Sequence, residues 1–173
     1  MDQINLQREQ SVRVFAMILA LVFAASARAD DWKEYENPEY SFAIHFPVDP
    51  KVEATTYRAG DGRSFEGRVF SVTRDTGSFK VTIVDMPDDK TGEELVRNAK
   101  PAGDGGAIKF DIGHRVRAVY GRQLGFADAS GGYAYVALFY HKKRLYEVEG
   151  KAFVAGGQAE VDAMRFQQSL DFT

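Results

Sequence analysis

Apolar side chains are densest over residues 133–140, where both sides of a two-residue period are apolar. A strand buried on one face alternates apolar with polar residues. Apolar residues on both sides therefore predict a strand that is covered on two faces and lies inside its sheet. The polar run His141–Arg144 predicts a turn, and residues 145–150 predict a returning strand. We expect this hairpin to form the middle of a β-sheet.

A two-residue period also predicts strands before this hairpin. It is clearest in Tyr40–Pro47, where aromatic and aliphatic residues share one side and Pro47 ends the strand. Gly113 and Gly121 are expected to bend the strands that contain them. Short consecutive strands joined by turns favour an antiparallel meander. The other predicted strands are 51–57, 64–74, 78–86, 108–119 and 121–129.

Two segments have the features of helices. Thr91 and Glu94 have the spacing of a capping box, which predicts a short helix that begins at Thr91. Near the C-terminus, apolar residues recur at helical spacing over residues 158–169. The predicted fold class is α+β: a twisted antiparallel sheet of about six to eight strands, flanked by a short middle helix and a C-terminal helix. The helical stripe consists of Ala159, Ala163, Phe166 and Leu170.

Residues 1–29 have the order of a secretory signal peptide. A polar, charged start with Arg8 and Arg13 precedes an apolar run over residues 14–25, and small residues follow at Ala27 and Ala29. The alternative is an uncleaved anchor, although the apolar run is shorter than the roughly 20 residues of a membrane span. We expect cleavage, which leaves residues 30–173 as a single α+β domain in the periplasm or outside the cell.

Charge and cysteine content narrow the possible partners and the source of stability. The whole chain has a formal net charge of −3 and no cysteine. Because the leader contains three arginines and two acidic residues, the remaining domain has a net charge of about −4. A mildly acidic domain argues against nucleic acid and anionic membrane surfaces as partners. Without disulfides, the exported domain must be stabilised by its core.

Four sequence features carry a resemblance to a known family. They are Y-x-F-x-I-x-F-P at Tyr40–Pro47, Gly121–Arg122 at the head of a strand, Arg144–Tyr146 in the last hairpin, and F-Q-Q-S-L at residues 166–170. In these features the chain resembles small exported bacterial proteins with a PsbP-like α/β sandwich, many of them uncharacterised. The resemblance implies an antiparallel sheet flanked by helices. By analogy with the extrinsic subunits of photosystems, it also implies a non-catalytic binding or assembly role, and it supplies no catalytic residues.

No metal or cofactor site is predicted. The histidines are far apart in sequence, whereas zinc sites usually place two ligands close together. Asp85, Asp88 and Asp89 lack the spacing of a calcium loop. We interpret them as a strand end followed by a helix N-terminus, where the helix dipole favours carboxylates. The three histidines are His45, His114 and His141.

Glu147 and Glu149 are the one carboxylate pair on a shared side of the hairpin. At the usual strand rise they lie about 7 Å apart, which suits a glycosidase, but we interpret them as solvated acids. The predicted function is an exported, non-catalytic binding or assembly module, with an envelope protein as the expected kind of partner. The alternatives are a small hydrolase, whose site is not readable from the sequence, and a small-ligand carrier.

Basic and aromatic residues on the last four predicted strands form a predicted partner surface. They would meet if those strands pair, and arginine and tyrosine are enriched at protein interfaces. The alternative is that the tyrosines belong to the core and the charges protect a sheet edge from aggregation. The predicted surface consists of Arg115, Arg117, Arg122, Tyr133, Tyr135, Lys143 and Arg144.

Overall fold

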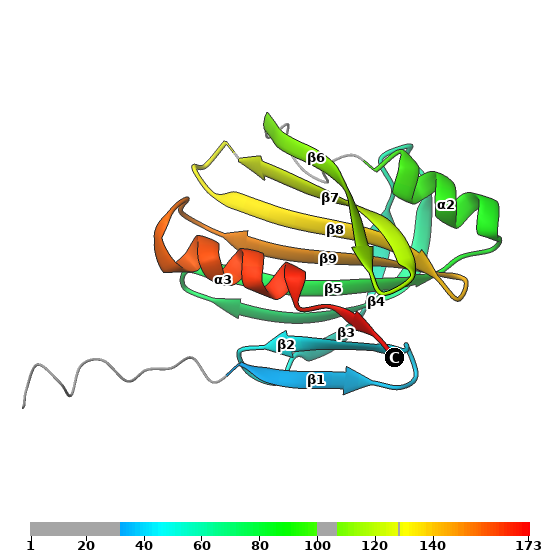
Figure 1. Cartoon of the computed structure of the whole chain (residues 1–173), viewed down its shortest axis with the longest axis horizontal. Coiled ribbons are helices and arrows are strands. Elements are labelled where there is room, and N and C mark those ends of the chain that lie inside the picture. The colour runs from blue at the N-terminus through cyan, green and yellow to red at the C-terminus, as the bar shows by residue number, and fades with distance from the viewer. Residues whose placement is uncertain (1–31, 100–106, 128) are drawn as a thin grey trace, which may run out of the picture. The chain divides into compact units, whose positions relative to one another are not determined.

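The computed structural model describes residues 32–99, 107–127 and 129–173 (Figure 1). The predicted signal peptide lies outside the described residues. Within these ranges, two antiparallel sheets and two helices form an α+β sandwich. None of the described helices combines the length and the apolar character that crossing a membrane requires.

The larger sheet has seven strands in the order β3-β4-β5-β9-β8-β7-β6, and every neighbouring pair is antiparallel. The predicted strand count and the meander from β3 to β5 are therefore confirmed. The strands are β3 (Lys51–Arg58), β4 (Ser64–Arg74), β5 (Gly77–Asp85), β6 (Ala107–Val116), β7 (Val119–Ala127), β8 (Tyr133–His141) and β9 (Arg144–Ala152).

The β8–β9 hairpin lies in the interior of this sheet, as its apolar pattern predicts. Residues 134–139 of β8 are all buried. In β9, Leu145 faces one side of the sheet and Tyr146 the other, and neither is exposed. Successive side chains point to opposite faces, so both faces of the hairpin must be covered.

One face is covered by helix α3 (Gly157–Gln168) and by the smaller sheet, which has the order β1-β2-β10. Figure 1 shows α3 lying along β9 and β5. The predicted aromatic side of β2 is confirmed, since Phe42, Ile44 and Phe46 pack with Phe166 of α3 in one buried cluster. The smaller sheet consists of β1 (Lys33–Asn37), β2 (Phe42–Phe46) and β10 (Asp171–Phe172).

The opposite face is covered in part by helix α2 (Asp89–Arg97), whose Leu95 and Val96 are buried. The prediction that this helix begins at Thr91 with a capping box is wrong. Asp88 is the N-cap, and its side chain accepts a hydrogen bond of 2.7 Å from the Thr91 backbone N–H. Aspartate is at least as good an N-cap as threonine, so the helix begins earlier.

Three further expectations about strands are corrected. Strands β1 and β10 were not predicted, because their short, polar segments become strands through pairing with β2. The strand predicted over residues 108–119 ends at Val116, because the chain turns at residues 117–118. The register shift lies between Ile108 and Phe110, while Gly113 and Gly121 pair regularly. Gly121 serves close packing, because a Cβ there would lie 2.2 Å from the carbonyl oxygen of Leu138.

Candidate functional site

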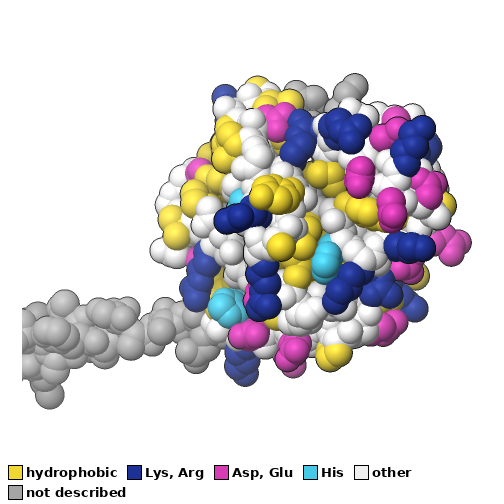
Figure 2. Space-filling model, turned by 45° about the vertical axis from the view of Figure 1, so that its right-hand side comes forward, with side chains coloured by type: hydrophobic (Ala, Val, Ile, Leu, Met, Phe, Trp, Pro, Cys, Tyr) yellow, Lys and Arg dark blue, Asp and Glu magenta, His cyan; other side chains and the backbone are white. Residues whose placement is uncertain are grey.

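Two hairpin turns lie next to each other at one end of the larger sheet. Strands β7 and β8 are paired neighbours, with Gly121 opposite Phe139. The β6–β7 turn and the β8–β9 turn therefore both lie at the right of Figure 1. Figure 2 brings this side forward and shows Lys and Arg side chains interspersed with acidic ones. We define the basic end as Arg115, Arg117, Lys142, Lys143 and Arg144.

The turns of the basic end have a backbone conformation that is unfavourable for the residues they contain. Arg117 has a φ of 51°, Lys142 of 49° and Lys143 of 62°. Among the described residues, only Ser41 is another non-glycine residue with positive φ. Two-residue hairpin turns favour Asn-Gly here, because a bulky side chain is strained in the left-handed region. The strained positions of the basic end thus carry long cationic side chains.

Two arginines of the basic end are fixed by ion pairs. The Arg117 guanidinium donates to both oxygens of Asp171, at 2.6 and 2.5 Å. This contact raises the pKa of Arg117 and lowers that of Asp171. The Arg144 guanidinium donates to Asp85 at 2.9 Å and lies 4.9 Å from the centre of the Tyr40 ring. These side chains are therefore held in place at the sheet end.

The other cations of the basic end are less constrained. Lys142 donates to the backbone oxygen of Thr173 at 3.1 Å. Arg115 lies 5.9 Å from the centre of the exposed Tyr120 ring. Within the described part of the chain, neither Arg115 nor Lys143 forms an ion pair with a carboxylate. Their charges are available to an acidic partner.

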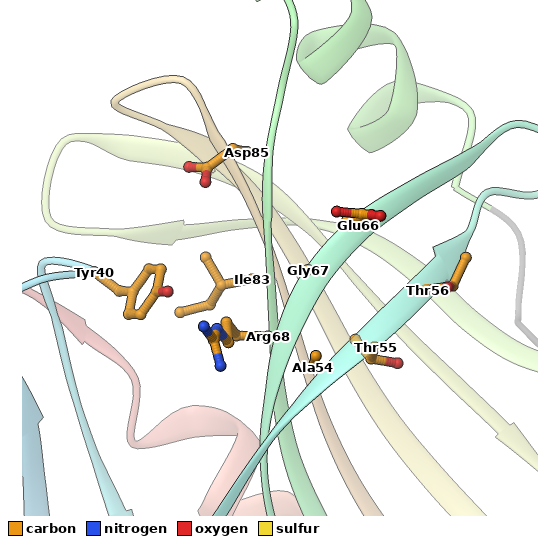
Figure 3. A pocket seen from close by; sticks show the side chains of 9 residues that line it. All are labelled: Tyr40, Ala54, Thr55, Thr56, Glu66, Gly67, Arg68, Ile83 and Asp85. Atoms are coloured by element: carbon orange, nitrogen blue, oxygen red, sulfur yellow. The ribbon is translucent and has the colours of Figure 1, made fainter.

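An open groove of about 550 Å³ lies beside Arg144. Figure 3 shows Tyr40 and Arg68 directed toward the same space, next to Ile83. The Arg68 side chain is exposed and has no ion pair among the described residues. The lining residues are Tyr40, Ala54, Thr55, Thr56, Glu66, Gly67, Arg68, Ile83 and Asp85.

The groove was not predicted from the sequence, although β4 contains a signal for it. Glu66 and Arg68 are on the same side of β4 as the buried Phe70 and Val72. When the residues on one face of a strand change from polar to apolar along its length, the polar end of the strand extends beyond the core. The residues across the groove, however, come from β3, β5 and the β1–β2 turn, and only the fold brings them together.

The structure brings together four of the seven residues of the predicted partner surface: Arg115, Arg117, Lys143 and Arg144. Arg122 faces the side of α2, donates to Asp111 at 3.1 Å and also bonds the backbone oxygen of Arg97 at the end of that helix. Tyr133 and Tyr135 lie toward the opposite end of β8, about 27 and about 20 Å from the turn by strand rise. The Tyr135 hydroxyl donates to Glu160 of α3 at 2.9 Å.

The interpretation of Glu147 and Glu149 as solvated acids is wrong. The Tyr57 hydroxyl donates to Glu147 at 3.0 Å, and the Lys80 ammonium lies 2.7 Å from Glu149. Burial, together with the nearby charge of Glu149, raises the pKa of Glu147 to about 7. Both carboxyl groups are thus engaged with side chains of other strands of the sheet, β3 and β5.

The histidines lie in separate surroundings. His45 is 3.9 Å from Glu34, His114 packs on the ring of Phe139, and His141 packs on Phe172. In the described ranges, no three histidine, cysteine, aspartate or glutamate side chains are close enough to hold a metal ion. The interpretation of the aspartates holds: Asp85 pairs with Arg144, and Asp88 and Asp89 lie at the start of α2.

Comparisons with known proteins relate the chain to one fold. Neither a protein-family model nor a curated protein sequence matches it. Among solved structures, the solution structure of cyanobacterial PsbP (CyanoP) from Synechocystis sp. PCC 6803 is similar, with a TM-score of 0.55 and 10% sequence identity. The similarity covers 86% of this chain and 96% of that chain. The protein therefore has a PsbP-like fold, an antiparallel sheet sandwiched between helices and a second small sheet.

Proposed function

We propose that the protein is an exported binding or assembly module of the bacterial periplasm, and that its basic end receives an envelope protein. The observation that carries the proposal is the backbone of the two adjacent turns. Arg117, Lys142 and Lys143 all have positive φ at the same end of the sheet. Strain of this kind persists where the surrounding structure imposes it, and it concentrates at functional sites.

The geometry of the basic end supports a protein partner. Arg144 and Arg117 are fixed by carboxylates, while Arg115 and Lys143 keep unpaired charges within the described part. Two arginines held in place, together with two cations that have no carboxylate partner in the described part, are suited to attracting and binding an acidic surface. The leader pattern of residues 1–29 supports export, and the PsbP-like fold agrees with the assembly role that the sequence resemblance implies.

The groove beside Arg144 favours binding over hydrolysis or ligand transport. Its two carboxylates belong to Glu66 and Asp85, and Asp85 is already bonded to Arg144. A catalytic carboxylate pair needs one group free to move a proton and the other free to act as nucleophile or base. A carrier needs an enclosed apolar cavity, whereas this groove is open and mainly polar.

Site-specific crosslinking in the native envelope tests the proposal. A photo-crosslinking residue replaces Lys143 in the full-length chain, and a matched chain carries it at Val154, which is 73% exposed beyond the other end of β9. We expect one dominant crosslinked protein from position 143 and none from position 154. Lys142→Glu should remove that product, while the matched charge reversal Lys33→Glu, on exposed β1, should leave it.

Two results would contradict the proposed function. One is the same set of products from both crosslinking positions, since this would reflect random collision. The other is the absence of any product from position 143 in cells whose protein level matches the wild type.

A further inference from the structure

Strand β6 forms a free edge of the larger sheet, and most of its ten residues are exposed. Because two residues join β6 to β7, Val116 and Val119 form a hydrogen-bonded pair. The alternation of an antiparallel ladder then directs the backbone N–H and C=O groups of Asp111, Gly113 and Arg115 away from β7. Within the described part, no loop backbone binds these outward groups.

Strand β6 has some of the usual protections of an edge strand and lacks others. Natural edges are shortened, bulged, charged or interrupted by proline. Strand β6 carries Lys109, Asp111 and Arg115 but contains no proline, and its register shift lies near its start, between Ile108 and Phe110. The remaining stretch, Asp111–Val116, pairs regularly with β7 and offers an outer edge without a register shift.

The side chains of β6 indicate what kind of strand would fit. Ile108 and Ile112 are 53% and 52% exposed, and the register shift between them places Ile108 opposite Phe126 on the α2 face and Ile112 opposite Gln123 on the α3 face. An apolar residue of an added strand would cover Ile112. Asp111 is neutralised by Arg122. Lys109 and Arg115 therefore remain as the charges of β6 without a carboxylate partner among the described residues, and an added strand needs acidic residues to match them.

We propose that β6 accepts an extended segment of a partner protein as an additional strand of the sheet, with apolar residues alternating with acidic ones. The segment's backbone would bond the outward groups of β6, its apolar side chains would cover Ile112 on the α3 face, and its carboxylates would face Arg115 on the opposite face. This inference rests on the proposed function, because it describes the form in which a partner is held.

A second copy of this chain fits the edge less well. Antiparallel pairing of two β6 strands centred on Ile112 would place Lys109 of one chain opposite Arg115 of the other. Pairing centred on Gly113 would place Arg115 opposite Asp111, which is already bonded to Arg122. Like charges directly opposite each other in a sheet are destabilising. Charge complementarity thus favours an acidic partner over self-association.

Gly113 allows a sharp test. A Cβ at this position meets no atom within 4 Å, and its backbone groups point outward. Gly113→Pro removes the outward donor and places a ring against the incoming strand, whereas the matched control Gly113→Ala keeps the N–H. The probe is a fluorescently labelled peptide as long as β6 that alternates valine with glutamate. A second peptide has lysine in place of glutamate.

We expect the glutamate peptide to bind the full-length protein and to slow hydrogen exchange in β6. Losing a backbone hydrogen bond and gaining a clash should weaken binding by about tenfold or more in Gly113→Pro. Gly113→Ala should bind like the wild type. Arg115→Glu, at an exposed position, provides a second readout that does not depend on proline and should shift preference toward the lysine peptide.

Several outcomes would overturn the inference: no binding of the glutamate peptide to the wild type, equal binding by Gly113→Pro, protection of β3 instead of β6, or a protein dimer that forms through β6. Crosslinking at Lys143 separates this result from the proposed function. If the Lys143 product persists in Gly113→Pro and the peptide does not bind, the edge-strand inference fails and the proposed function stands.

Discussion

Glu147 should make the stability of the domain depend on pH in an unusual direction. Its carboxyl group accepts a hydrogen bond from Tyr57 and lies near Glu149, and burial raises its pKa from 4.5 to about 7. An acid with a raised pKa binds its proton more tightly in the folded state. Its contribution is therefore fully present below pH 4.5 and is lost as the pH rises toward 7.

The size of this loss follows from the pKa shift. One unit corresponds to about 1.4 kcal/mol, so a shift from 4.5 to about 7 lowers the free energy of unfolding by roughly 3 kcal/mol above neutral pH. Glu147→Gln keeps the shape and the acceptor for Tyr57 but cannot ionise. We expect the variant to be about 3 kcal/mol more stable than the wild type near pH 8.5, and less than about 1 kcal/mol more stable near pH 5.

Urea unfolding of both proteins at the two pH values measures this difference. Burial lowers the pKa of His114 and His141, so these groups also make stability depend on pH. They are common to both proteins, so they cancel when the variant is compared with the wild type at each pH. An equal stability difference between the two proteins at both pH values would refute the assignment of a half-buried Glu147 that holds its proton more tightly in the folded state.

Three further substitutions test separate parts of the structure. A Cβ on Gly150 would lie 1.9 Å from the carbonyl oxygen of Ala163, so Gly150→Ala should destabilise the domain by about 3 kcal/mol in urea unfolding. Replacing Lys142 and Lys143 by Asn and Gly should raise the free energy of unfolding by about 1 kcal/mol and reduce crosslinking from a probe placed at Arg117. Asp88→Ala should lose about 1 kcal/mol, whereas Asp88→Asn should retain the wild-type value if this side chain is the N-cap.

The strands of the core could be predicted because their sequence pattern and their burial have the same cause. Residues 133–140 are apolar on both sides since helices, the smaller sheet and neighbouring strands cover both faces of β8. The aromatic side of β2 and the stripe of α3 were predictable for the same reason. By contrast, β1 and β10 carry no such pattern, because pairing with β2 alone makes them strands.

The candidate site could be predicted only in part. Pairing of β7 with β8 was enough to place Arg117 near Lys143, since both flank short turns. The groove depends on segments that are distant in sequence and line the same space, such as those that carry Tyr40 and Arg68 (Figure 3). The surroundings of Glu147 likewise depend on Tyr57, which reaches it from a strand three positions away in the sheet.

The positions that carry the functional proposals are those where local sequence and local structure disagree. Lysines occupy turn positions that favour asparagine and glycine, and the edge strand β6 lacks proline over its regularly paired stretch. In the core strands, propensity, apolar pattern and packing agree, as in a sequence that specifies one fold. Both exceptions lie on the β6–β9 side of the larger sheet. A partner that pairs with β6 would extend toward the basic end, since β6 ends at the turn that carries Arg117. Binding of a partner at the β8–β9 turn and at β6 would then explain why the residues at these two places are not those that stabilise the fold most.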